Sequence, residues 1–221
     1  MKFRFKGKEY YIDGRLALQL NSICYNLKKD WDFILLVTGD RTVRTGKSVL
    51  AMTVCAYLSM TLNKMKIKSD FSLDNIFFSS RKMLSDVLKF RKHSIVMYDE
   101  GRESLSSTKM FTDIQKDILD YFAECGQLNH IFVVVLPDYF GLVEEMAVAR
   151  SEFLLNVYRT NTKLITDAFK TGEKIPIVRF DRGRFEFFNR STKRKLYDKA
   201  RATRMRSYGL QKATLIGRFT N

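Results

Sequence analysis

The tripeptide Gly46-Lys47-Ser48 carries the residue types that bind phosphate. It follows an apolar run, Phe33 to Val37, and precedes an apolar stretch of helical character, Val49 to Leu62. Backbone N–H groups at the N-terminus of a helix attract phosphate oxygens, a lysine at this position reaches the β- and γ-phosphates, and the serine hydroxyl is a ligand for Mg²⁺. A strand, a glycine-bearing turn, Lys, Ser and a helix therefore predict a phosphate-binding loop (P-loop).

The spacing of the glycines differs from the usual motif, Gly-x-x-x-x-Gly-Lys-Ser/Thr. Arg41 occupies the position of the first glycine, and six residues rather than four separate Gly39 from Gly46. Either the loop is longer than usual or its first glycine is replaced. The tripeptide alone also occurs on surface loops, so the assignment depends on its structural context. The predicted nucleotide-binding residues are Gly39, Thr45, Gly46, Lys47, Ser48 and Val49, and Lys47 is also a predicted catalytic residue.

Two adjacent carboxylates follow a second apolar run. Ser94 to Tyr98 predicts a buried strand, and Asp99 and Glu100 come directly after it. In open α/β sheets, ligands bind beyond the carboxyl ends of the strands. Asp99 is therefore predicted to hold Mg²⁺ together with Ser48, and Glu100 to polarise the attacking water as a general base. The alternative is that the two acids only end a strand and pair with Arg102 or a lysine.

Apolar strands alternate with helical patterns along the chain. This alternation predicts an α/β fold with a mostly parallel sheet and helices on both faces. The predicted domains are an N-terminal hairpin and helix (1–30), a P-loop ATPase core (31–160) and a basic C-terminal extension (161–221). The other predicted elements are a hairpin at Phe3–Ile12, helices at Arg15–Leu27, Arg81–Phe90, Thr108–Cys125, Phe140–Ala149 and Lys193–Tyr208, strands at Asn75–Ser79, Ile131–Leu136 and Phe153–Tyr158, and a hairpin turning at Asp181-Arg182-Gly183.

The charge of the chain is strongly positive, +15 with a pI near 9.8. From Ile175 onward, thirteen basic residues face three acidic ones. This excess predicts a polyanionic partner, with DNA the first candidate, an anionic membrane surface the second, and a merely solvated basic face the alternative. The predicted phosphate contacts are Lys193, Arg194, Lys195 and Arg201, and the aromatic residues interleaved with the basic ones are Phe185, Phe187, Phe188, Tyr197 and Tyr208.

The cysteines and the N-terminal sequence indicate the cellular compartment of the protein. Cys24, Cys55 and Cys125 are odd in number and far apart, which favours reduced core thiols over disulfides. The N-terminus has no signal-peptide pattern, and no apolar segment approaches the roughly 20 residues of a membrane span. We expect a cytoplasmic protein, located in the host cytoplasm if the chain is viral.

Over residues 33–160 the chain resembles the ASCE division of P-loop ATPases. The resemblance lies in the order of a P-loop strand, an intervening strand–helix unit and a strand ending in Asp-Glu. The following strand, helix, arginine and strand are similar to FtsK–HerA-type DNA translocases and to zonular occludens toxin-like phage assembly ATPases. The resemblance implies a RecA-like fold and a ring-forming homo-oligomer that handles DNA using ATP and Mg²⁺. It places Gly46, Lys47 and Ser48 on the phosphate motif and Asp99 and Glu100 on the second motif. These families place a polar sensor residue at the end of the next strand, where this chain has Asp138. Arg150 is a candidate arginine finger that would act on the nucleotide of a neighbouring subunit, unless it pairs with Glu145 or Glu152.

The preferred function is an ATP-hydrolysing, DNA-handling motor. A nucleoside or nucleotide kinase is the first alternative, although no arginine-rich lid over a substrate pocket is evident. A nucleotide-binding assembly module that does not hydrolyse ATP is the second, because the loop is longer than usual. An ATPase assay with and without DNA distinguishes the three. DNA-stimulated hydrolysis would support the motor, phosphotransfer to a nucleoside or nucleotide would support the kinase, and no turnover would support the assembly module.

Overall fold

The computed structural model describes residues 1–29, 31–39, 45–99, 116, 119–121, 128–167 and 174–219. Glu100, the loop residues 40–44 and most of the helix predicted at Thr108–Cys125 lie outside the described residues. The fold below is therefore built from the remaining elements.

The main sheet of the described chain has seven strands in the order β4-β5-β6-β3-β7-β8-β9. The strands are β3 (Phe33–Gly39), β4 (Ile76–Phe77), β5 (Ile95–Asp99), β6 (Ile131–Val135), β7 (Ser151–Asp167), β8 (Lys174–Phe188) and β9 (Leu215–Arg218). Strands β4, β5, β6, β3 and β7 are parallel to one another, whereas β8 is antiparallel to β7 and β9 is antiparallel to β8. The predicted α/β class with a mostly parallel sheet and helices is confirmed.

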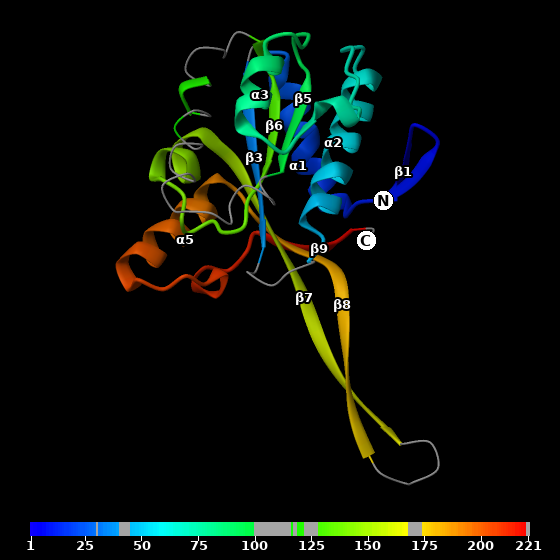
Figure 1. The fold of residues 1–221 in the computed structure, drawn as a ribbon, viewed down its shortest axis with the longest axis vertical. Coiled ribbons are helices and arrows are strands. Elements are labelled where there is room, and N and C mark those ends of the chain that lie inside the picture. Colours follow the sequence, from blue (N-terminus) through cyan, green and yellow to red (C-terminus); the bar gives the residue numbers. More distant parts are fainter. Residues whose placement is uncertain are drawn as a thin grey trace.

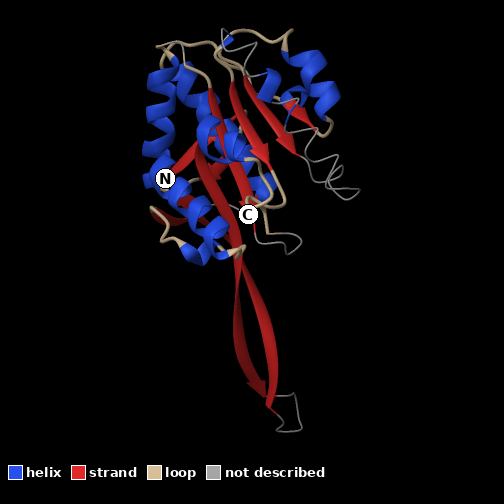
Figure 2. Cartoon of the chain, turned by 90° about the vertical axis from the view of Figure 1, so that its left-hand side faces the viewer, coloured by secondary structure: helices blue, strands red, loops and turns tan. Residues whose placement is uncertain are grey.

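Helices cover both faces of this sheet (Figures 1 and 2). One face packs against α1 (Gly14–Leu27) and α2 (Lys47–Lys64). The other packs against α3 (Ser80–Val87), the π-helical segment η4 (Glu145–Arg150) and α5 (Arg190–Thr203). Parallel strands covered on both sides are apolar throughout, which explains why every residue of β3, β5 and β6 is buried.

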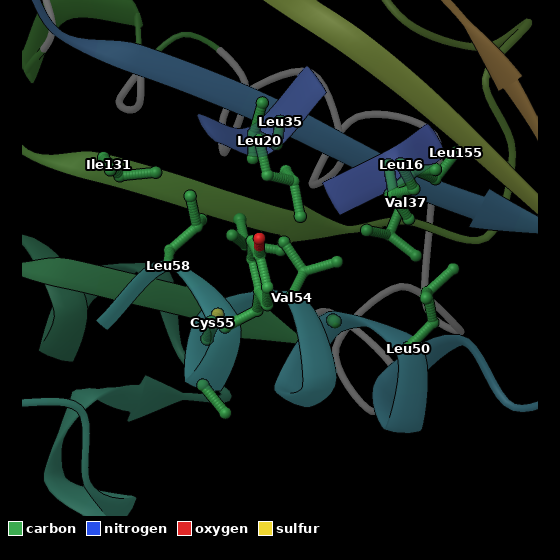
Figure 3. Packing of buried hydrophobic residues seen from close by; sticks show 14 of the residues in the cluster. Leu16, Leu20, Leu35, Val37, Leu50, Val54, Cys55, Leu58, Ile131 and Leu155 are labelled. Carbon is green, nitrogen blue, oxygen red and sulfur yellow. The ribbon is translucent and has the colours of Figure 1, made fainter. Parts of the chain in front are cut away.

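Helix α2, which follows the P-loop, is held in place by its packing against the sheet. Leu50, Val54 and Leu58, spaced four residues apart, point from α2 toward the strands (Figure 3). They join a core cluster with Val37 of β3 and Ile131 of β6. Because residues four apart lie on one face of a helix, this spacing docks α2 along β3 and β6. Complete burial of each such side chain is worth about 1.5–3 kcal/mol.

The N-terminal elements agree with the sequence prediction. Strands β1 (Lys2–Phe5) and β2 (Lys8–Tyr11) form the predicted hairpin. Helix α1 begins after Asp13, whose carboxylate accepts a hydrogen bond of 2.9 Å from the backbone N–H of Arg15. An isolated bridge between Ile12 and Phe219 brings the N-terminal region beside the end of the described chain.

Strands β7 and β8 leave the body as a long two-stranded arm (Figures 1 and 2). Within the sheet, β7 pairs with β3 up to Val157, and β8 pairs with β9 from Arg184 onward. Beyond these positions the two strands pair with each other as far as Asp167 and Lys174. Because β3 ends where the arm begins, the arm projects from the sheet edge that also carries the P-loop.

Two sequence predictions in this region are wrong. The hairpin predicted at Asp181-Arg182-Gly183 does not exist, because β8 runs through these residues and the connection of β7 to β8 falls at 168–173. The glycine instead serves an irregularity in the ladder, where the register shifts between Tyr158 and Thr160 and Gly183 takes a φ of 77°. The predicted helix Phe140–Ala149 is reduced to η4, at Glu145–Arg150.

Candidate functional site

The P-loop unit has the geometry of a strand, a turn and a helix N-terminus. Gly46 precedes α2 with a φ of 96°, and its carbonyl accepts the first helical hydrogen bond, 3.0 Å long, from the N–H of Leu50. A positive φ is a conformation that glycine adopts at little cost. This turn places Lys47, Ser48 and Val49 at the N-terminus of α2, the end of a helix at which backbone N–H groups bind anions.

Gly39 lies directly against the start of α2. A Cβ atom at this position would meet the Val157 carbonyl oxygen at 2.9 Å, Lys47 Cδ at 3.0 Å and Thr45 Oγ1 at 3.1 Å. No side chain fits in this space without a shift of backbone. The structure therefore brings together Gly39, Thr45 and Lys47, three residues that the sequence predicts to bind nucleotide.

The hydroxyl of Thr45 is an unsatisfied polar group beside this glycine. Thr45 is buried, and its Oγ1 has no hydrogen-bond partner among the described residues. Buried polar atoms are normally hydrogen-bonded, so an orphaned one calls for an explanation. A phosphate oxygen or a Mg²⁺-bound water would supply the missing partner, and the Lys47 side chain nearby is of the type that binds phosphate.

Asp99 lies on the same side of the sheet as α2. Side chains alternate between the faces of a strand, and Ile95 and Met97 of β5 belong to the core cluster on the α2 face. Asp99 continues this alternation and is only 8% exposed. It lies level with Val37, because both residues pair with Val135 of β6. With neighbouring strands about 4.8 Å apart, Asp99 stands about 10 Å across the sheet from the P-loop strand.

The second predicted carboxylate, Glu100, lies outside the described residues, as does Arg41. Ser48 is half-buried at the first turn of α2. The two residues predicted to hold Mg²⁺ thus lie on the same side of the sheet, Ser48 in the first turn of α2 and Asp99 at the end of β5. Oxygen ligands of this kind suit Mg²⁺, which keeps several waters and binds one or two protein groups beside the substrate phosphates.

Arg150 lies far from the P-loop of its own chain. It ends η4, and the next residue, Ser151, pairs with Ile34 near the start of β3, whereas Val157 pairs with Gly39. The six intervening steps of β7 span about 20 Å at 3.3 Å per residue. Arg150 Nε lies 3.7 Å from a carboxylate oxygen of Glu145, the pairing that the sequence offered as the alternative. Any contact of Arg150 with a nucleotide therefore needs a second subunit.

Sequence reasoning missed a connection between the C-terminal segment and the P-loop strand. Thr38, the neighbour of Gly39, faces away from α2, and its Oγ1 accepts a hydrogen bond of 2.9 Å from the Tyr208 hydroxyl. The Tyr208 ring packs against Phe140 and Phe188, with ring centroids 5.0 and 6.4 Å away. Burial raises the pKa of Tyr208, which keeps this hydroxyl a neutral donor. The sequence carries no local feature that pairs these residues.

The basic C-terminal segment is partly core, which corrects the predicted set of phosphate contacts. Lys193 is completely buried, and its ammonium donates to the carbonyls of Val148 and Ser151 and to the Ser151 hydroxyl. Burial lowers the pKa of Lys193 to about 7. Lys193 therefore holds η4 against α5 and cannot contact nucleic acid.

The aromatic residues interleaved with the basic ones are core residues as well. Phe185, Phe187, Phe188 and Tyr197 are buried in the hydrophobic clusters on the two faces of the sheet. They therefore cannot stack on bases. The basic residues that remain exposed include Arg190, Arg194, Lys195, Lys199, Arg201, Arg204 and Arg206. Among the described residues, no helix combines the length and the apolar character needed to cross a lipid bilayer.

Comparison with known proteins found similarity among solved structures but none among family models or curated sequences. No protein-family model matches it, and no curated protein matches its sequence. Among solved structures, it is similar to C. elegans PCH-2, with 16% sequence identity and a TM-score of 0.43 over 66% of this chain and 42% of that chain. The match thus spans less than half of that protein. The mostly parallel α/β sheet, with Lys47 at the start of α2 after β3, is consistent with a RecA-like P-loop NTPase fold.

Proposed function

We propose that this chain is an ATPase that binds Mg-ATP at the N-terminus of α2. The observation that carries the proposal is the convergence of Gly39, Thr45 and Lys47 within a few ångströms, with the Thr45 hydroxyl buried and unsatisfied within the described chain. This arrangement supports the interpretation in which Gly39 is the first glycine of a lengthened P-loop. Asp99 lies on the same face of the sheet, level with the end of β3.

The roles of the residues follow from their chemistry. The N–H groups of Gly46 to Val49 and the Lys47 ammonium hold the phosphates, and Ser48 and Asp99 hold Mg²⁺. The metal ion, when bound, neutralises charge that develops on the phosphate oxygens. Glu100, the neighbour of Asp99, orients the attacking water and accepts its proton. Arg150 completes the site from a neighbouring subunit of a homo-oligomer.

The finer proposal is that the ATPase handles DNA, as a packaging, transfer or translocation motor in the cytoplasm. Its support is the row of exposed basic residues on α5 and the segment after it. Arg190, Arg194 and Arg201 are spaced so that they lie along one side of the helix. A basic row of this kind neutralises the phosphates of a nucleic acid backbone.

An ATPase assay with and without DNA tests the proposal. We expect Mg²⁺-dependent hydrolysis that DNA stimulates and that Lys47→Ala abolishes, with the folded state retained. Lys64→Ala, at the other end of α2, is the matched control and keeps activity. Phosphotransfer to an added nucleoside or nucleotide would instead identify a kinase. ATP binding without turnover would identify an assembly module, and equal ATP affinity in the parent and in Lys47→Ala would refute the site.

A further inference from the structure

A pocket of about 250 Å³ opens at the C-terminal end of α5. Three arginines, Arg201, Arg204 and Arg206, line it together with Phe140, Tyr197 and Met205. Three guanidinium groups around one small cavity repel one another unless an anion occupies it. The pocket thus combines a positive rim with an apolar wall.

The three arginine side chains differ in the hydrogen bonds and ion pairs that they form. Arg201 donates a hydrogen bond of 3.2 Å to the Tyr197 hydroxyl and lies over the Tyr197 ring, 5.6 Å from its centroid. Arg206 lies 3.4 Å from a carboxylate oxygen of Asp138. For the Arg204 side chain, no ion pair or hydrogen bond to another described residue is found. Two of the three guanidinium groups thus have a polar partner in a neighbouring side chain, and that of Arg204 has none within the described chain.

The balance of charge at the pocket remains positive. Asp138 offsets one arginine, and the carbonyl end of α5 adds the equivalent of about half a negative charge. More than one unit of positive charge is left for a ligand. Arginine forks match the geometry of phosphate oxygens, with two parallel N–H donors for two oxygens.

We infer that this pocket binds a backbone phosphate of a nucleic acid strand, an inference that rests on the DNA-handling part of the proposed function and gives it a location. The exposed residues Arg190 and Arg194 precede Arg201 on the same side of α5, so the row leads a polyanion into the pocket. Arg194 and Arg201 are about 10 Å apart along the helix axis, a distance that more than one phosphate spans. The Phe140 and Met205 wall gives the adjoining sugar or base an apolar surface.

The experiment is a titration of a labelled oligothymidylate and of a labelled duplex, without nucleotide, at several salt concentrations. The test variant is the pair Arg201→Gln and Arg204→Gln, and the control is the pair Lys212→Gln and Arg218→Gln, which removes the same charge from exposed positions outside the pocket. We expect the test pair to weaken binding at least about tenfold, and the control pair less than about threefold. The log–log salt slope should fall by about 0.7 for each single-strand phosphate that the test pair no longer neutralises. Thermal unfolding verifies that all variants are folded.

The outcomes separate the inference from its alternatives. Equal affinity and equal salt slope in the parent and the test pair would overturn it, as would equal weakening in the test and control pairs. Competition by vesicles containing phosphatidylserine, but not by unlabelled oligonucleotide, would identify a membrane contact instead. Competition by inorganic phosphate at equal phosphate concentration would show that the pocket takes the free anion rather than a strand. Because no ATP is present, pocket-dependent binding by a chain that does not hydrolyse ATP would keep this inference and refute the ATPase.

Discussion

The Tyr208 hydroxyl donates a 2.9 Å hydrogen bond to Thr38 Oγ1, joining residues that are 170 positions apart in the chain. Thr38 belongs to the P-loop strand and precedes Gly39, which contacts Lys47. Tyr208 packs on Phe140, which lines the arginine pocket. This hydrogen bond thus connects the segment after α5 with the strand that carries the proposed nucleotide site.

Tyr208→Phe removes this hydrogen bond and little else. It leaves the buried Thr38 hydroxyl without its donor, so we expect a decrease of about 1–3 kcal/mol in the free energy of unfolding. Urea denaturation measures it, with Tyr25→Phe, at an exposed tyrosine, as the control. Thr38→Val should cost less in the Tyr208→Phe background than it costs in the parent, because the hydrogen bond between the two hydroxyls is already lost. Fully additive effects would mean that the two hydroxyls do not act together.

Gly39→Ala tests the close approach at the P-loop. The added Cβ would come within 2.9 Å of the Val157 carbonyl oxygen and 3.0 Å of Lys47 Cδ. We expect a decrease of about 1–3 kcal/mol in stability and a weaker affinity for ATP, since Lys47 must move. Gly14→Ala is the matched control, because its Cβ would meet no atom within 4 Å. An ATP affinity unaffected by Gly39→Ala would remove this glycine from the site.

Substitutions of the two adjacent carboxylates should affect ATP binding and ATP hydrolysis differently. Glu100→Gln keeps the size of the side chain and removes the base, so Mg-ATP binding should survive while hydrolysis falls by about 10²–10⁴-fold. Asp99→Asn should instead weaken the Mg²⁺-dependent part of ATP binding. Calorimetry with and without Mg²⁺, together with a phosphate-release assay, measures both effects. Normal turnover in Glu100→Gln would show that another group activates the water.

The buried Lys193 predicts a dependence of stability on pH. Burial lowers its pKa from 10.5 to about 7 in the folded chain. Between these values the unfolded chain binds the extra proton, so the contribution of Lys193 to stability should rise with pH from about 7 to 10.5 and be lowest below pH 7. The slope is at most about 1.4 kcal/mol per pH unit.

Urea denaturation of the parent and of Lys193→Met at pH 7.5 and 9.5 isolates this effect, because other titrating groups are common to both chains. The stability difference between the two should change in favour of the parent at the higher pH. Lys199→Met, at an exposed lysine of the same helix, is the control. The same pH response in Lys193→Met and in the parent would mean that Lys193 is protonated in the folded state throughout.

The sequence predicted those elements whose patterns are local. The apolar run of β3, the Gly-Lys-Ser turn and the apolar length of α2 each point to the structure that forms. Asp181-Arg182-Gly183 has the chemistry of a turn as well, but pairing along β7 extends β8 through it. Propensity over a few residues is a weak guide where long-range strand pairing competes with it.

Parts of the candidate site depend on contacts between distant segments. Lysines are almost never fully buried, so a basic run gives no reason to place Lys193 inside the protein. Its burial follows from the carbonyls of Val148 and Ser151, which belong to other elements. The pairing of Tyr208 with Thr38 is equally invisible in the sequence, because it depends on the whole path of the chain from β3 to the segment after α5.

The central place of β3 has a consequence for how the protein folds. Both of its neighbours in the sheet, β6 and β7, come from the second half of the chain, whereas α2 follows β3 directly. Contacts between distant segments form slowly, since the loop between them must be closed first. We therefore expect β3 to pair with its neighbours late in folding, so that the proposed nucleotide site forms only when most of the chain has folded. A nucleotide that binds this completed site then stabilises the whole folded chain by mass action rather than the loop alone.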